Sequence, residues 1–234
     1  MKRLLQISDC HIDDVEQSIG VNSHQNLSLV VDKITQLEAD ALLISGDLSH
    51  YGSLNSYKKL KQLLAPIDTD LFVIAGNHDD KNNLSAVFNE NLFTLFTLGK
   101  WDIISVDSVQ AGQTSGYLTK QVLLDLEARL TQSTAEYILL VLHHPIVSMQ
   151  STWDDTLSLE NPQDLFAILT KHSNIQAVLF GHAHQSAEFK KNGLRIIACP
   201  STAVQFNDES RIGFNYYRLY DEGKFDCEVK WIAS

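Results

Sequence analysis

The chain has 234 residues, of which 44% are hydrophobic and 20% charged, a composition typical of soluble globular proteins. Its length fits one large domain over residues 1–234 better than two small ones. The formal net charge of -11 comes without any long run of Lys or Arg, so a nucleic-acid duplex is not an expected partner. An acidic protein that acts on an anion needs a local positive centre, and bound divalent metals supply one.

The cysteines and the N-terminus indicate a cytoplasmic protein. There are three cysteines, an odd number whose spacing fits neither a disulfide framework nor a zinc finger, and this favours a reducing compartment. The apolar run after Met1 is interrupted at Gln6 and ends at Asp9, too early for a signal-peptide core. No apolar stretch is long enough to cross a membrane, so we expect no membrane partner.

Short apolar runs bounded by turn residues predict strands at 3–8, 41–45, 71–75, 101–107, 137–142, 177–180, 194–198, 212–220 and 225–232. Apolar residues at helical spacing predict four helices, along 27–37, 57–64, 122–130 and 165–169. Pro162 fits the first turn of the last of these helices. The early alternation predicts a parallel sheet with crossover helices, and residues 221–224 predict a hairpin turn between late antiparallel strands.

Five short polar motifs each follow one of the predicted strands. They are Asp9-x-His11, Gly46-Asp47, Gly76-Asn77-His78-Asp79, His143-His144-Pro145 and Gly181-His182-x-His184. Ligands bind beyond the carboxyl ends of strands in open α/β sheets, so we expect these side chains to meet at one edge. The glycines let the backbone turn tightly there. Each motif alone is a weak signal, but all five in this order are hard to obtain by chance.

The motif set resembles the calcineurin-like metallophosphoesterases, whose pattern it matches over residues 9–184 with no ligand position missing. The resemblance implies an α/β fold, a four-layer α/β/β/α sandwich of two mixed sheets flanked by helices. It also implies two metal ions. Asp9, His11 and His184 would hold the first, Asn77, His143 and His182 the second, and Asp47 would bridge both. His143 is preferred to His144 because Pro145 stands two residues after it.

Carboxylate, imidazole and carboxamide ligands suit Mn, Fe or Zn, and we expect Fe or Mn in first place. Two ions roughly 3.5–4 Å apart can share a water and lower its pKa, which gives a bridging hydroxide that attacks phosphorus. His78 matches the non-ligand histidine of the family, so the resemblance makes Asp47 and His78 the expected catalytic residues. His78 either protonates the leaving oxygen or holds a phosphoryl oxygen. Asn77, His78 and His184 are expected to contact the substrate, and Asp79 to orient His78 or stabilise its protonated form.

Three further segments, residues 20–23, 151–161 and 200–206, resemble the bacterial class III cyclic nucleotide phosphodiesterases, the cyclic AMP enzymes in particular. Ala203 departs from the Cys expected there, and the loop at 112–116 is shorter. The resemblance implies hydrolysis of 3′,5′-cyclic AMP to 5′-AMP. The sequence leaves open whether the protein is a monomer or a homodimer. The alternatives are a broader phosphodiesterase for glycerophosphodiesters or 2′,3′-cyclic nucleotides, and a non-catalytic protein-binding scaffold.

For some aromatic residues and histidines the sequence leaves two roles open. Trp153 and the 200–206 segment either contact the substrate or pack a loop onto the sheet. His24 either starts a helix or approaches the substrate, and His50 faces either solvent or the edge of the site. Cys10 lies between two expected ligands and is expected to face away from them as a small buried residue.

Overall fold

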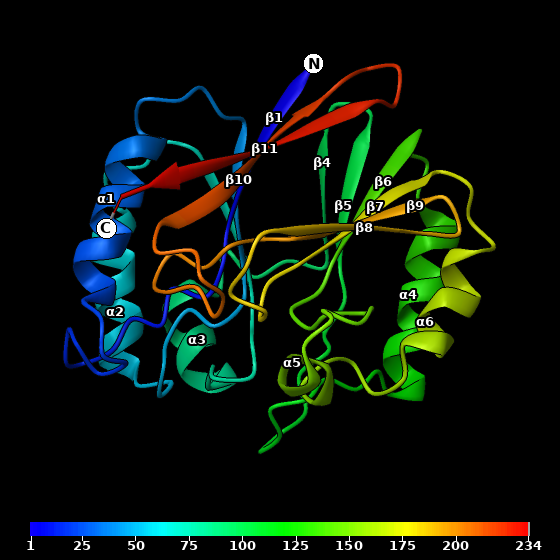
Figure 1. The fold of residues 1–234 in the computed structure, drawn as a ribbon. Helices are drawn as coiled ribbons and strands as arrows, with labels where there is room; N and C mark the ends of the chain where they lie inside the picture. The colour runs from blue at the N-terminus through cyan, green and yellow to red at the C-terminus, as the bar shows by residue number, and fades with distance from the viewer. Residues whose placement is uncertain (234) are drawn as a thin grey trace.

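The computed structural model describes residues 1–233, which form two β-sheets with helices on their outer faces (Figure 1). The first sheet has the strand order β11 (Phe225–Ile232), β10 (Ile212–Leu219), β1 (Lys2–Ile7), β2 (Ala41–Ser45) and β3 (Asp70–Ile74). The second has the order β4 (Leu95–Leu98), β5 (Trp101–Ser105), β6 (Tyr137–Val141), β7 (Ile175–Phe180), β9 (Leu194–Ala198) and β8 (Ala187–Lys191). Both sheets contain parallel and antiparallel pairs, which confirms the two mixed sheets that the resemblance implied.

Two groups of helices form the outer layers (Figure 1). The first sheet is accompanied by α1 (Ser23–Ile34), α2 (Leu54–Leu64) and α3 (Lys81–Phe88), and the second by α4 (Lys120–Gln132) and α6 (Pro162–Leu169). The short α5 (Thr152–Thr156) lies between the two groups (Figure 1). No helix of residues 1–233 is long and apolar enough to span a membrane.

Alternating side chains along the central strands build the core. In β1, Leu5 packs with the helices of its own layer, whereas Leu4 packs in the cluster between the two sheets. Strand β6 contributes Leu139 to the same inter-sheet cluster and Leu140 to the cluster under α4 and α6. Strands buried on both faces read as continuous apolar runs, which is why they are recognisable in the sequence.

The nine predicted strands and four predicted helices are confirmed, with ends that differ by a few residues. The predicted hairpin turn joins β10 to β11, where the Tyr220 N–H donates to the Lys224 carbonyl. Four elements were missed: α3, β4, α5 and β8. Each is short, and β4 and β8 are edge strands with exposed residues at alternate or most positions, so neither carries a continuous apolar run.

Candidate active site

The five motif loops leave the carboxyl ends of β1, β2, β3, β6 and β7 and meet in one place. The first three strands belong to one sheet and the last two to the other. The expected meeting of these residues at one sheet edge is therefore corrected: the site spans two sheets. The ligands after strands of the first sheet are Asp9, His11, Asp47 and Asn77, and those after strands of the second are His143, His182 and His184.

One group of candidate ligands consists of Asp9, His11 and His184, all of them buried. The Nε2 atoms of His11 and His184 lie 2.9 Å apart. Oδ1 of Asp9 lies 3.4 Å from Nε2 of His184. Three ligand atoms from loops after β1 and β7 thus point at one position.

A second group consists of Asn77, His143 and His182. Oδ1 of Asn77 lies 3.1 Å from Nε2 of His143 and 2.9 Å from Nδ1 of His182. The two ring nitrogens are 3.3 Å apart. These atoms also converge on one position, so the sequence-predicted residues are brought together in the two predicted sets.

Asp47 lies between the groups. Its Oδ2 is 3.7 Å from Nε2 of His11 and 3.4 Å from Nε2 of His143. Its Oδ1 accepts the backbone N–H of His78 at 2.9 Å. One carboxylate therefore faces both sets of imidazoles and leaves the oxygen nearest to them without a backbone donor.

Two of the imidazoles turn Nε2 towards the centre and Nδ1 towards a backbone carbonyl. Nδ1 of His184 lies 2.8 Å from the carbonyl oxygen of Val204, and Nδ1 of His143 lies 2.9 Å from that of Ser45. A carbonyl can only accept, so each Nδ1 carries the proton and, in the neutral ring, Nε2 is an acceptor. These Nε2 atoms face carboxylate oxygens that are acceptors too. Such an arrangement fits a bound cation, and the nitrogen and oxygen donors suit a first-row transition metal.

The ionisation of the buried groups differs between the imidazoles. Burial lowers, and the Asp47 carboxylate raises, the pKa of His143, which reaches about 9. Burial and His184 lower the pKa of His11 to about 3. Burial opposes the ionisation of Asp47, but the neighbouring His143 charge holds its pKa well below the usual range. At neutral pH His143 is therefore an imidazolium paired with the Asp47 carboxylate, whereas His11 is neutral. A metal ion bound at the centre would take the place of the His143 proton.

Strained backbone is concentrated at the same residues. Within residues 1–233, seven non-glycine residues have a positive φ, and five of them are candidate ligands: Asp9, His11, Asp47, His182 and His184. Left-handed φ values cost energy for residues with a side chain and persist where the surroundings impose them, commonly at functional sites. The backbone thus indicates the site independently of the side-chain chemistry.

Two of the motif glycines are explained by close approach as well as by turning. A Cβ at Gly76, whose φ is not positive, would overlap Oδ1 and the backbone nitrogen of Asp47. Gly46 has a φ of 102°, and a Cβ there would also overlap the His143 ring. The expectation of tight turning holds for Gly46, whereas Gly76 makes room for the carboxylate of Asp47.

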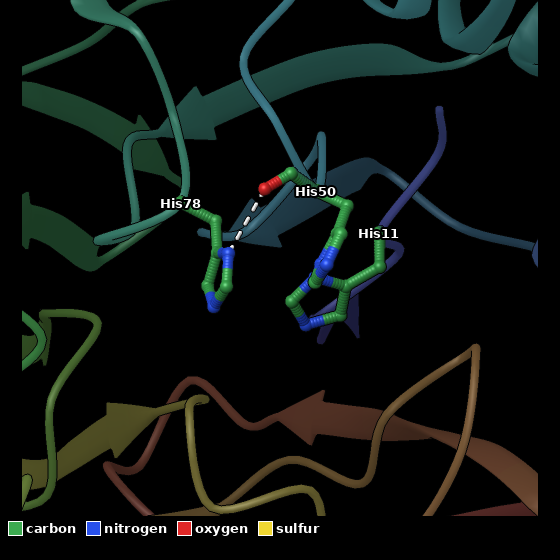
Figure 2. A group of neighbouring side chains, drawn as sticks. All are labelled: His11, His50 and His78. Atoms are coloured by element: carbon green, nitrogen blue, oxygen red, sulfur yellow. Dashed lines mark hydrogen bonds between the residues drawn. The ribbon is translucent and has the colours of Figure 1, made fainter. Parts of the chain in front are cut away.

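His78 and His50 lie beside His11 at the edge of the centre, as Figure 2 shows. Nδ1 of His78 donates to the His50 carbonyl at 2.9 Å, and the two rings stack with centroids 4.9 Å apart (Figure 2). Nδ1 of His50 lies 3.3 Å from Nδ1 of His11. His50, for which the sequence left two interpretations, therefore belongs to the edge of the site.

Asp79 does not orient His78 in the way that we expected. Its carboxylate accepts the backbone N–H groups of Leu48, Ser49 and Gly76 and the hydroxyl of Tyr57 at 2.8–3.2 Å. Burial and then Asp47 raise its pKa to about 6. Asp79 therefore ties the loop after β2 to the loop after β3, and the proton on Nδ1 of His78 is held by the His50 carbonyl instead.

Two other histidines lie outside the ligand groups. Nδ1 of His144 is 2.8 Å from Oγ of Ser108 and its Nε2 is 3.1 Å from the Thr114 carbonyl, so both ring nitrogens are already occupied. This supports the choice of His143 over His144. His24 lies in the first turn of α1 with Nε2 2.9 Å from the Asp13 carbonyl, which fits the helix-start interpretation. Cys10 is fully buried, as expected.

A cavity of about 230 Å³ opens over the two groups. It is lined by His11, Ile19, Asp47, His50, Asn77, His78, Thr114, Trp153, Leu157, His182, His184, Val204 and Phe206. None of these residues is a Lys or Arg. An anion bound here would therefore find no cationic side chain of the lining other than a protonated histidine.

The fold and the site define a metallophosphoesterase, and the family model for calcineurin-like phosphoesterases matches residues 2–186. The chain belongs to this family, which confirms the predicted family and identifies a phosphoester hydrolase. A solved dimetal phosphatase from Danio rerio has the same fold, with a TM-score of 0.73 at 15% identity over 98% of this chain and 95% of that one.

Curated relatives are similar over nearly the whole chain. A probable cyclic nucleotide phosphodiesterase of Vesicomyosocius okutanii is 61% identical over 229 residues, which cover 98% of both chains. The 3′,5′-cyclic adenosine monophosphate phosphodiesterase CpdA of Pseudomonas aeruginosa is 34% identical over 241 residues, with 97% of this chain and 88% of the relative covered. These similarities confirm the resemblance that the sequence motifs indicated.

Proposed function

We propose that the chain is a two-metal phosphodiesterase that hydrolyses 3′,5′-cyclic AMP to 5′-AMP. The observation that carries the proposal is the position of Asp47 between two groups of three converging ligand atoms. The names of the relatives support the substrate class, and the small cavity supports a mononucleotide rather than a polymer.

In this proposal Asp9, His11 and His184 would hold one ion, Asn77, His143 and His182 would hold the other, and Asp47 would serve both. Fe or Mn is the first choice, and Zn is compatible with the same ligands. Bound divalent ions would supply Lewis acidity, which lowers the pKa of the attacking water and neutralises charge on the phosphoryl oxygens. This matters here because the cavity lining contains no Lys or Arg among the described residues.

The ligand loops keep the imidazoles in one orientation. The carbonyl oxygens of Ser45 and Val204 hold the Nδ1 protons of His143 and His184, which fixes Nε2 of each as the ligand atom. The short contact between Asp47 Oδ1 and the His78 N–H fixes the position of the shared carboxylate.

His78 is the proposed proton donor. Its Nδ1 proton is already given to the His50 carbonyl, so the neutral ring has only a lone pair at Nε2. Only the imidazolium form can donate from Nε2, either to a phosphoryl oxygen or to the leaving 3′ oxygen. Asn77 and His184, which line the same cavity, are the other proposed contacts to the substrate.

The proposal is tested with protein loaded with Mn²⁺ or Fe²⁺ and given cyclic AMP, with 5′-AMP and 3′-AMP separated by chromatography. We expect 5′-AMP, at a kcat/KM above that for 2′,3′-cyclic AMP and glycerophosphodiesters. Asp47→Ala should lower the rate by at least about 10²–10³-fold, as expected when a group that stabilises charge is removed. Asp226→Ala, an exposed aspartate on β11, is the matched control.

Two outcomes would contradict the proposal in different ways. Fast turnover of another diester with little turnover of cyclic AMP would support the phosphodiesterase assignment and exclude cyclic AMP as the substrate. Bound metal without turnover of any diester would instead favour a protein-binding scaffold.

A further inference from the structure

Two large aromatic side chains stay half-exposed at the mouth of the cavity. Trp153 on α5 is 57% exposed, and Phe206 in the 200–206 segment is 49% exposed. Both line the same cavity as the candidate metal ligands. Adjacent exposed rings beside a polar centre form an apolar patch of the kind that commonly marks a binding surface.

The two rings meet at a right angle, and we refer to this pair as the aromatic corner. Their centroids are 5.3 Å apart and their planes make an angle of 83°. The Phe206 ring also stacks on His184, with centroids 3.9 Å apart and an angle of 5° between the planes. The aromatic corner thus adjoins a ligand of the first proposed ion directly.

The aromatic corner is held in place from both sides. The Phe206 N–H donates to the carbonyl of His184, and Nδ1 of His184 donates to the Val204 carbonyl. On the other side, the side chain of Ser151 caps α5 by accepting the Asp154 N–H at 3.3 Å. A surface that is ordered before binding loses little conformational entropy when a ligand arrives.

We propose that the aromatic corner binds the base of the cyclic nucleotide by stacking while the phosphate reaches the ligand groups; this inference rests on the proposed function. Ile19, Leu157 and Val204 extend the apolar wall of the cavity beside the two rings. A substrate with a charged phosphate at one end and a flat ring at the other matches a cavity with these two ends. A glycerophosphodiester has no ring to place there.

Stacking has a recognisable kinetic signature. It tolerates every base because each has a π face, so it contributes to binding without reading hydrogen-bond donors. Loss of the contact should therefore reduce kcat/KM for base-containing substrates selectively. If Trp153 only packed a loop, its removal would affect all diesters equally.

The test compares cyclic AMP with methyl ribofuranoside 3′,5′-cyclic phosphate, which has the same cyclic phosphate and no base. In metal-loaded Trp153→Ala the ratio of the two kcat/KM values should fall by about 5- to 150-fold. Trp153→Phe should restore most of the ratio because it keeps an aromatic face. Trp231→Ala, on β11 and outside the cavity lining, should leave the ratio unchanged.

An independent readout is the tryptophan fluorescence of metal-loaded protein titrated with 5′-AMP. Quenching in the wild type that disappears in Trp153→Phe supports the contact, whereas equal quenching in both overturns it. In Trp153→Ala, an unchanged ratio of the two kcat/KM values, including equal losses on both substrates, would overturn base binding at the aromatic corner. It would not contradict cyclic AMP hydrolysis. Wild-type hydrolysis of the base-free diester alone would overturn the nucleotide assignment, and the inference with it.

Discussion

Nε2 of His11 lies 2.9 Å from Nε2 of His184, although the residues are 173 positions apart in the chain. Nδ1 of His184 carries a proton for the Val204 carbonyl, so the Nε2 atom that faces His11 is an acceptor when the ring is neutral. The negative Asp9 carboxylate adds a third potential metal ligand, with Oδ1 3.4 Å from Nε2 of His184. Such a group is stable when a cation or a proton lies among its atoms, and this relationship leads to the first prediction.

Metal binding should stabilise the fold. A ligand that binds the native state at a free concentration of 100 times its Kd raises the free energy of unfolding by about 2.7 kcal/mol. Calorimetry should show a higher Tm with Mn²⁺ than after dialysis against a chelator, and a smaller effect in Asp9→Ala. Identical melting curves with and without Mn²⁺ would argue against a metal centre.

Gly76→Ala should disrupt the centre because the new Cβ would overlap Asp47. We expect weaker metal binding together with lower activity. Gly112→Ala is the matched control: its Cβ meets no atom within 4 Å, but its φ of 73° is strained for alanine. The control should lose stability by about 1 kcal/mol and keep its metal affinity. Equal metal affinities in the two variants, measured by titration calorimetry, would show that close approach at Gly76 is unimportant.

Asp79→Asn should act mainly on stability. The amide would place a donor against some of the four donors that now converge on the carboxylate, and buried hydrogen bonds to a charged group contribute about 1.5–3 kcal/mol each. Tyr57→Phe, which removes one of these donors, should cost less. Chemical denaturation measures both variants. A large loss of kcat in Asp79→Asn with an unchanged free energy of unfolding would contradict this and support the expected role of Asp79 in orienting His78 or stabilising its protonated form.

Asp40 should make stability depend on pH. Burial raises the pKa of its carboxyl. The Lys2 ammonium and the Arg3 N–H, both at 2.7 Å, together lower this pKa by more than burial raises it, so the net shift is downward. A carboxyl with a lowered pKa in the fold stabilises above its unfolded pKa, near 3.9, and loses this contribution as pH falls through the folded value. Asp40→Asn should lower the free energy of unfolding at pH 7 by about 0.5–1 kcal/mol.

The difference between Asp40→Asn and wild type should shrink at the acidic end of a pH series. Asp68→Asn, an aspartate in the loop before β3, is the comparison variant. A difference that stays constant down to the lowest pH would show that ionisation of Asp40 contributes nothing.

Much of the fold and the centre could be predicted from the sequence because the central strands are buried on both faces and end in polar motifs. Leu4, Leu5 and Ile7 mark a strand, and Asp9 follows two residues after Ile7. The roles of Asp79 and His50 could not be predicted. Asp79 serves loops that approach only in three dimensions, and His50 carries no pattern that links it to His78, 28 positions later. Likewise, the residues next to His182 in the sequence give no sign of its positive φ.

The most direct test of the central claim follows 5′-AMP formation from cyclic AMP while metal-free protein is titrated with Mn²⁺. Two groups of ligand atoms with Asp47 between them predict a rate that rises to a plateau at two equivalents of metal per chain. A plateau at one equivalent would contradict the two-metal centre, and absence of 5′-AMP at every ratio would contradict the proposed function.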